Sequence, residues 1–229
     1  MATTIQSAFT DLKSNLEITG LQKETVSKRQ QTVRNCVSAG LTVLNSFLTG
    51  SYARSTMISP LSEADIDIFV VLDPSHYSVK GHASLLEKVR QVILKTYTRT
   101  PKISRNGQAV TITFSDFIVD VVPAFNRSGG GYLIPSTTQN AWIATDPTVH
   151  VNYMSEQNRN NNGNLVPMIK MLKGWNMQNG VVLRSFYLEL IATDIYKGVT
   201  ITDFPSGARY FFDKGREKVK FTARDPVPF

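Results

Sequence analysis

The segment from Asp65 to Leu72 limits the fold of this chain more than any other. It reads Asp-Ile-Asp-Ile-Phe-Val-Val-Leu and ends at the turn signal Asp73-Pro74, which predicts a strand. Residues two apart in a strand point to the same face, so Asp65 and Asp67 would lie together on one face. The opposite face would turn toward the core and carry Ile66, Ile68, Val70 and Leu72.

Two neighbouring carboxylates repel each other unless a cation compensates them, and carboxylate oxygens suit Mg²⁺ or Mn²⁺. A lone Asp-x-Asp is weak evidence, because such a pair often lies on the solvent side of an edge strand. Gly50-Ser51 precedes this strand, and small residues there let backbone amides and a hydroxyl approach a phosphate closely. The glycine and serine alone carry almost no signal, but together with Asp65 and Asp67 they form a specific pattern.

Asp120 is a third candidate acid. It lies in the apolar stretch Phe117-Ile-Val-Asp-Val-Val, which predicts another strand. A carboxylate buried there is costly unless it is paired or binds a metal, and exposure on an edge strand is the alternative. Three carboxylates on neighbouring strands can hold two ions that activate a ribose hydroxyl and stabilise a leaving pyrophosphate. The expected chemistry is nucleotidyl transfer.

Periodicity and turn residues predict the remaining elements. The expected helices cover residues 5–16, about 24–44, 83–97, 165–179 and 185–197, the last capped by Ser185. Two further strands are expected at 109–114 and 117–122, with Pro123 closing the second. Residues 126–147 are expected to be a long irregular segment, and 158–164 a flexible connector.

This order of elements predicts an α+β protein. Residues 1–164 would form a catalytic lobe with N-terminal helices and a mixed sheet flanked by helices, and residues 165–229 a helical C-terminal lobe.

Composition restricts the class of protein and of partner. The net charge of +7 suits a nucleoside triphosphate or a nucleic acid, without choosing between them. The denser basic stretches, around Lys95 to Arg105 and Arg209 to Arg224, could equally be solvated faces. No apolar run is long enough for a bilayer and no secretory signal is present, so we expect a cytosolic protein without membrane partners. Cys36 is the only cysteine, which excludes an intrachain disulfide.

Two motifs carry a family resemblance. Gly50-Ser-Tyr-Ala-Arg-Ser-Thr-Met-Ile58 and Glu63-Ala-Asp-Ile-Asp-Ile-Phe-Val-Val71 resemble the polymerase-beta-like nucleotidyltransferases. More narrowly, the chain is similar to the bacterial cyclic-oligonucleotide synthases of anti-phage signalling systems, relatives of cyclic GMP-AMP synthase and the oligoadenylate synthases. The similarity continues to about Ile195 through Gly131-Tyr-Leu-Ile-Pro135, Trp142-Ile-Ala-Thr-Asp-Pro147, Ile169-Lys-Met-Leu-Lys-Gly-Trp-Asn176 and Ser185-Phe-Tyr-Leu-Glu189.

The resemblance implies a role for each matching residue. Ser51, next to Gly50, would contact the terminal phosphates of the donor. Two Mg²⁺ or Mn²⁺ ions would be held by Asp65 and Asp67, and Asp120 would complete one metal site and help to deprotonate the attacking hydroxyl. The triphosphate would be held from the helical lobe by Lys173 and Ser185, with Lys170 as a second candidate. Without the resemblance, a solvated lysine and a simple N-cap are equally good interpretations.

The resemblance also implies ATP or other nucleoside triphosphates as substrates, an infection-linked trigger, and a downstream effector that binds the cyclic product. Transfer of a single nucleotide to a small molecule or an RNA end stays open, and so does a non-catalytic nucleotide- or nucleic-acid-binding module. Activation by double-stranded nucleic acid ranks low, because one cysteine and three dispersed histidines offer no zinc-binding insertion. Family members generally continue with further helices after the region similar to Arg224-Asp-Pro, which leaves open an incomplete C-terminal lobe.

Overall fold

The computed structural model describes residues 4–99 and 102–221. Contacts divide the chain into two compact units. The sheet unit consists of Thr19–Tyr52 and Leu61–Pro147, and the described part of the helical unit consists of residues 4–18, 53–60 and 148–221. From the sequence we expected one boundary between the two lobes, at residue 164. The helical unit instead consists of three separate segments of the chain.

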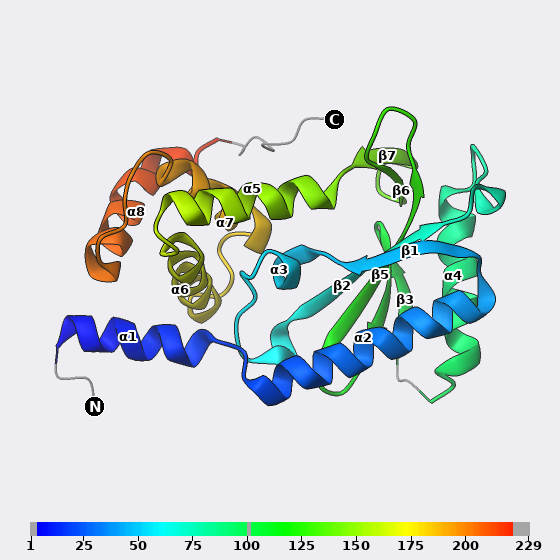
Figure 1. The fold of residues 1–229 in the computed structure, drawn as a ribbon, viewed down its shortest axis with the longest axis horizontal. Coiled ribbons are helices and arrows are strands. Elements are labelled where there is room, and N and C mark those ends of the chain that lie inside the picture. The colour runs from blue at the N-terminus through cyan, green and yellow to red at the C-terminus, as the bar shows by residue number, and fades with distance from the viewer. Residues whose placement is uncertain (1–3, 100–101, 222–229) are drawn as a thin grey trace. The chain divides into compact units, whose positions relative to one another are not determined.

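Seven strands of the described residues form a mixed sheet in the sheet unit (Figure 1). Their order is β1-β2-β5-β4-β3, and β6 pairs with both β5 and β7. Strands β2 and β5 are parallel, and the other pairs are antiparallel. The strands are β1 (Val43–Leu48), β2 (Asp65–Leu72), β3 (Lys102–Asn106), β4 (Ala109–Thr113), β5 (Ile118–Asn126), β6 (Tyr132–Ser136) and β7 (Ala141–Thr145).

The alternation predicted for Asp65 to Leu72 is confirmed, because Ile66, Ile68, Val70 and Leu72 are all buried. Helices α2 (Gly20–Gly40) and α4 (His82–Thr96) contact the sheet and each other. They bury Val33 and Val37 from α2, and Leu86, Val89 and Ile93 from α4. These side chains recur at helical spacing, so each helix covers the sheet with one apolar face.

The helix expected to extend to Leu44 ends at Gly40 instead. A Cβ at Gly40 would lie 2.5 Å from Cγ1 of Val92, so α2 and α4 are closely packed where α2 ends. The chain then enters β1, which pairs antiparallel with β2. The apolar residues of this segment suit a helix as well as a strand, so local pattern could not distinguish the two. Its strand conformation is determined by pairing with β2, which is distant in sequence.

Pro123 lies inside β5, which continues to Asn126 and pairs with β6 there. The segment expected to be irregular, 126–147, contains the hairpin formed by β6 and β7. Its apolar side chains explain the difference. Ile134 packs with Phe69, Val71 and Ala124 in a buried cluster, and Tyr132 and Ile143 pack against that cluster. The apolar side chains of the hairpin therefore cover part of the sheet.

The helical unit has its own core. Its longer helices are α1 (Ile5–Leu16), α5 (Pro147–Asn160), α6 (Leu165–Gln178), α7 (Ser185–Ile195) and α8 (Phe204–Lys218). Met168, Ile169 and Leu172 of α6 pack with Leu188 of α7 and Phe211 of α8. The turn after α5, expected to be flexible, is hydrogen-bonded: Val166 N donates to Asn158 Oδ1 at 2.9 Å, and Gly163 N donates to the Asn158 carbonyl at 2.8 Å.

The predicted cap of α7 is wrong by one residue. Arg184 occupies the N-cap position without a side-chain hydrogen bond, and Ser185 is the first residue of the helix. Helix α8 does have a side-chain cap, because Ser206 N donates to Asp203 Oδ1 at 2.8 Å.

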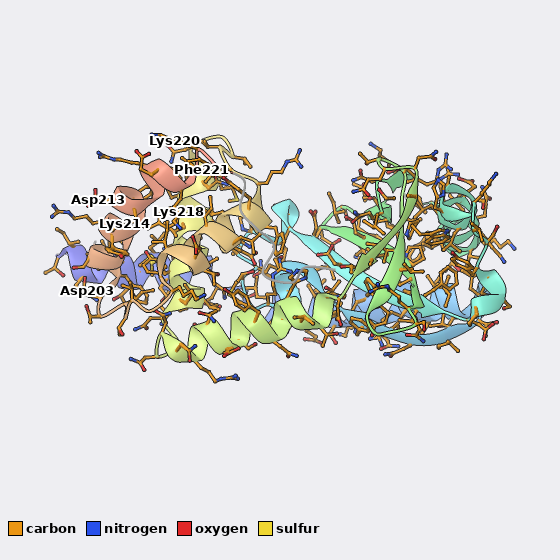
Figure 2. All side chains as sticks on the ribbon, turned by 90° about the horizontal axis from the view of Figure 1, so that it is seen from above. Asp203, Asp213, Lys214, Lys218, Lys220 and Phe221 are labelled. Atoms are coloured by element: carbon orange, nitrogen blue, oxygen red, sulfur yellow. The ribbon has the colours of Figure 1, made fainter. Side chains whose placement is uncertain are left out.

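The C-terminal basic stretch lies largely on α8. Figure 2 shows Asp203 where this helix begins and Lys218 where it ends. Lys218 forms an ion pair with Asp194, whereas Arg224 and the region that follows it lie outside the described residues. None of the described helices combines the length and apolar character that a membrane span requires.

Candidate active site

The parallel pairing of β2 with β5 brings the predicted acids together. Asp67 is the register partner of Asp120, and Asp65 is the partner of Ile118. Register partners on parallel strands point to the same face, and Asp65 shares that face because it lies two residues before Asp67. All three carboxylates therefore belong to one face of the sheet, within a single unit of the chain.

The electrostatics of this face favour a cation. Partial burial raises the pKa of Asp65, and the neighbouring charge of Asp120 raises it further. Burial also raises the pKa of Asp120, while a hydrogen bond from Thr111 Oγ1 to Asp120 Oδ1, 2.6 Å long, acts in the opposite direction. Raised carboxylate pKa values mean that the ionised forms are destabilised here, so a positive charge nearby would stabilise them.

Position 50 requires a glycine for two reasons, its backbone conformation and the closeness of the Asp67 side chain. Its φ is +64°, and a Cβ built on it would lie 1.7 Å from Oδ2 of Asp67. The backbone reinforces this approach, since Thr49 N donates to the Asp67 carbonyl at 2.9 Å. The short helix α3 (Gly50–Ala53) begins here and includes Ser51, which is partly buried. The sequence suggested a glycine that lets a phosphate approach, and the structure adds that only glycine leaves room for the Asp67 carboxylate.

The chemistry of the donor set fits a divalent cation, because carboxylate oxygens on adjacent strands are hard ligands of the kind that Mg²⁺ and Mn²⁺ prefer. As the side chains lie, no group of three His, Cys, Asp or Glu among residues 4–99 and 102–221 is arranged to hold a metal ion. A metal at Asp65, Asp67 and Asp120 therefore stays a proposal.

The three phosphate-binding residues predicted in the helical unit, Lys173, Lys170 and Ser185, differ in how far they are exposed to solvent. Lys173 is 6% exposed, and its Nζ donates to Glu189 Oε1 at 2.5 Å and to the Thr56 carbonyl at 3.0 Å. Lys170 is also buried and pairs with Glu17 at 2.8 Å. Ser185 is exposed at the beginning of α7. Of these three residues, only Ser185 presents its side chain to solvent in the structure.

Glu189 is the centre of a buried polar cluster that we did not predict from the sequence. It is fully buried and accepts hydrogen bonds from Arg54 Nε at 2.7 Å and Thr56 Oγ1 at 2.8 Å as well as from Lys173. Burial alone would raise the pKa of Glu189, but Lys173 and Arg54 outweigh it and hold this pKa below its ordinary value. Burial lowers the pKa of Lys173, and Glu189 opposes that shift. A signal did exist, because Glu189 is a single charge in an otherwise apolar stretch of α7.

A pocket of about 390 Å³ adjoins the acids in the sheet unit. Its lining includes Asp67 and Asp120, together with residues 106–109 of the β3–β4 turn and residues of the β6–β7 turn. We did not anticipate this pocket from the sequence, because β3 and the β6–β7 hairpin were not predicted.

Known proteins resemble this chain over most of its length. Residues 3–158 match the family described as "Second Messenger Oligonucleotide or Dinucleotide Synthetase domain". The chain is 27% identical over 186 residues to a cyclic AMP-AMP-AMP synthase of Acinetobacter sp. (strain ATCC 27244 / 9458), with 77% of this chain and 53% of that protein covered. It is 24% identical over 226 residues to the CBASS oligonucleotide cyclase CdnC of Escherichia coli (strain KTE188), with 92% and 68% covered. The chain thus spans about half the length of the Acinetobacter relative.

A solved structure shows the same fold. The CdnE cyclic dinucleotide synthase of Elizabethkingia meningoseptica, determined with GTP and Apcpp, matches with a TM-score of 0.75 at 17% identity, over 95% of this chain and 86% of that one. This likeness confirms the expected fold class. The resemblance inferred from Gly50-Ser51 and the Asp65 segment is also confirmed, since the family match covers more than half of the chain. The chain belongs to the Second Messenger Oligonucleotide or Dinucleotide Synthetase domain family.

Proposed function

We propose that this protein is a metal-dependent nucleotidyltransferase of the cytosol that makes a cyclic di- or oligonucleotide second messenger for anti-phage defence. The observation that carries the proposal is the register pairing of Asp67 with Asp120, beside a glycine that only just accommodates the Asp67 carboxylate. A family fold alone would not imply catalysis, whereas three acids on one sheet face beside a ligand-sized pocket support it.

The proposed reaction is an in-line displacement. The ribose hydroxyl oxygen bonds to the α-phosphorus of the donor triphosphate, the bond to the leaving pyrophosphate breaks, and the hydroxyl proton goes to Asp120. Thr111 would hold the accepting carboxylate through its hydrogen bond to Asp120 Oδ1. Two Mg²⁺ or Mn²⁺ ions held by Asp65, Asp67 and Asp120 would supply charge neutralisation for both oxygens at the phosphorus.

Phosphate binding is assigned to Gly50, Ser51, Lys170, Lys173 and Ser185 as part of the same proposal. Ser51 would donate its hydroxyl to the terminal phosphates of the donor. The ammonium of Lys173 binds Glu189 in the structure, so a direct contact with a phosphate would require it to exchange partners. Ser185 is exposed and needs no such change.

The cyclic product is supported by the names of the relatives, a cyclic AMP-AMP-AMP synthase and a CBASS oligonucleotide cyclase. The structural relative was determined with GTP and Apcpp, which supports nucleoside triphosphates as substrates here. A downstream effector that binds the product is the partner that this function requires.

Incubation with labelled nucleoside triphosphates and Mg²⁺ or Mn²⁺, followed by phosphatase, tests the proposal. A cyclic product has no terminal phosphate, so we expect a labelled species that resists the phosphatase. Linear, phosphatase-sensitive products would contradict cyclisation, and label that appears only on an added small molecule or RNA end would indicate single-nucleotide transfer. Nucleotide binding without any product would indicate a non-catalytic module.

A further inference from the structure

We propose that the pocket beside Asp67 and Asp120 binds the nucleoside part of the acceptor nucleotide, and that Gln108 and Gln139 recognise its base. The inference rests on the proposed function, because it gives the pocket the substrate whose hydroxyl Asp120 would deprotonate. It adds the part of the substrate that the pocket takes and the two side chains that select among the bases.

The rim of the pocket is held in place by hydrogen bonds between two turns. Both the backbone N and the Oγ1 of Thr137, in the β6–β7 turn, donate to the carbonyl of Gly107 in the β3–β4 turn, each at 3.0 Å. Within the β6–β7 turn, Gln139 N donates to Oγ of the buried Ser136 at 3.1 Å. Gly107 adopts a φ of +60°, which favours glycine at the tip of the β3–β4 hairpin. The two turns therefore form one connected rim, to which Gln108 and Gln139 both belong.

The size of the pocket suits a small ligand. Its volume of about 390 Å³ lies within the range of small-molecule sites, near the lower end. A nucleoside fits a volume of this size, whereas a longer nucleotide chain does not. The proposed reaction requires a nucleoside as part of its acceptor.

The charge of the lining indicates which part of a nucleotide enters. Asp67 and Asp120 contribute two carboxylates, and no Lys, Arg or His lines the pocket within the described residues. The proposed ions would compensate the two carboxylates, and the rest of the described lining is uncharged, which suits the ribose and base rather than a phosphate. A ribose hydroxyl can donate a hydrogen bond to a carboxylate such as Asp120. The pocket therefore suits the nucleoside, with its phosphates directed elsewhere.

Gln108 and Gln139 are suited to recognise a base. Both line the pocket and are exposed, and within the described part of the chain neither carboxamide has a hydrogen-bond partner. A carboxamide offers a donor and an acceptor in fixed geometry, which matches the donor and acceptor pairs on the edges of bases. Since no aromatic side chain lines the pocket among the described residues, hydrogen bonds rather than stacking would distinguish the bases.

Nucleoside binding tests the inference without requiring catalysis. Adenosine, guanosine, cytidine and uridine are titrated separately into the metal-free protein, and each dissociation constant is measured by NMR. We expect a preference among the four nucleosides, and for the preferred one a roughly 3- to 10-fold weaker affinity in both Gln108→Ala and Gln139→Ala. Gln31→Ala removes an exposed carboxamide on α2 and serves as the matched control, with unchanged affinity.

Several outcomes separate this inference from the proposed function. Binding of none of the nucleosides, or equal affinity in wild type and both glutamine variants, would overturn the inference. Product formation from a mixture of the four triphosphates is measured in parallel. Intact, glutamine-dependent nucleoside binding with no product would support the pocket and contradict the proposed function. Product with the same base composition in wild type and both variants would contradict base recognition by Gln108 and Gln139 alone.

Discussion

Asp67 on β2 and Asp120 on β5 lie directly opposite each other across the parallel strand pair of the described sheet. They come from segments far apart in sequence, and they were singled out for different reasons: Asp67 alternates with apolar residues, and Asp120 is a charge within an apolar strand. Their pairing turns two separate sequence signals into a single anionic face. The neighbouring Asp65 adds to it, because its pKa is raised by partial burial and by the charge of Asp120.

Gly50→Ala should abolish most of the transfer activity. The new Cβ would overlap the Asp67 carboxylate and force it to move, and a displacement of about 1 Å at a reacting centre can cost roughly 100-fold in rate. Gly198→Ala is the matched control, since Gly198 also has a positive φ but has open space around its Cβ position. The initial rate of pyrophosphate release is measured for both. Equal rates in the two variants would show that the contact with Asp67 does not matter.

Thr111→Val should lower the rate of transfer by roughly 10-fold or more while the fold is kept. It removes the hydroxyl that donates to Asp120, and a hydrogen bond to a charged group contributes on the order of 1.5–3 kcal/mol. Thr111→Ser retains the donor and should retain most of the rate. Thr113→Val, on the same strand, tests for a general effect of losing a hydroxyl from β4. A Thr111→Val enzyme as fast as wild type would remove Thr111 from the site.

Glu189→Gln should destabilise the helical unit. Arg54 and Lys173 would lose their shared counterion in a buried position, and breaking a buried ion pair costs about 3–5 kcal/mol. Thermal unfolding of the variant measures the loss. Glu24→Gln, which breaks an exposed pair with Lys28, should leave the Tm unchanged. A Tm for Glu189→Gln equal to that of wild type would show that the cluster contributes nothing to stability.

The same variant has a predictable pH dependence. The pKa of Glu189 is held below its ordinary value of 4.5, so its ionised form is favoured in the folded state. The stabilisation is then fully present above pH 4.5 and is lost as the pH falls through the folded-state pKa. The difference in stability between wild type and Glu189→Gln should therefore stay constant from pH 7 to about pH 4.5 and shrink below it. A difference that shrinks well above pH 4.5 would contradict the lowered pKa.

Local pattern was enough to predict that Asp65 and Asp67 share one face of a strand. Asp65 and Asp67 alternate with buried isoleucines, and alternation is a property of a single strand. The same holds for α6, because the helix expected at 165–179 is observed at Leu165–Gln178. Strand β1 was missed because the pairing of Val43 to Leu48 with β2 decided its conformation. The β6–β7 hairpin was hidden by the glycines and prolines around it, and its stability comes from packing against β2 and β5.

The Glu189 cluster and the pocket rim depend on contacts that no local pattern encodes. Glu189 binds Arg54 and Thr56 across most of the length of the chain, and Thr137 reaches Gly107 from a different hairpin. A buried charge in an apolar helix indicates that a partner exists, but it does not identify the partner. The pocket is likewise formed by contacts between distant segments, so the sequence predicted the three carboxylates but not the pocket beside them.

The most direct test of the central claim is the rate of nucleotidyl transfer in Asp67→Asn and Asp120→Asn. Both substitutions keep shape and remove charge, so we predict no detectable product from either variant, with a Tm at or above that of wild type because repulsion within this group of carboxylates is relieved. Asp213→Asn, at an exposed position on α8 labelled in Figure 2, should be fully active. Product formed at the wild-type rate by the Asp67→Asn, Asp120→Asn double variant would contradict the account.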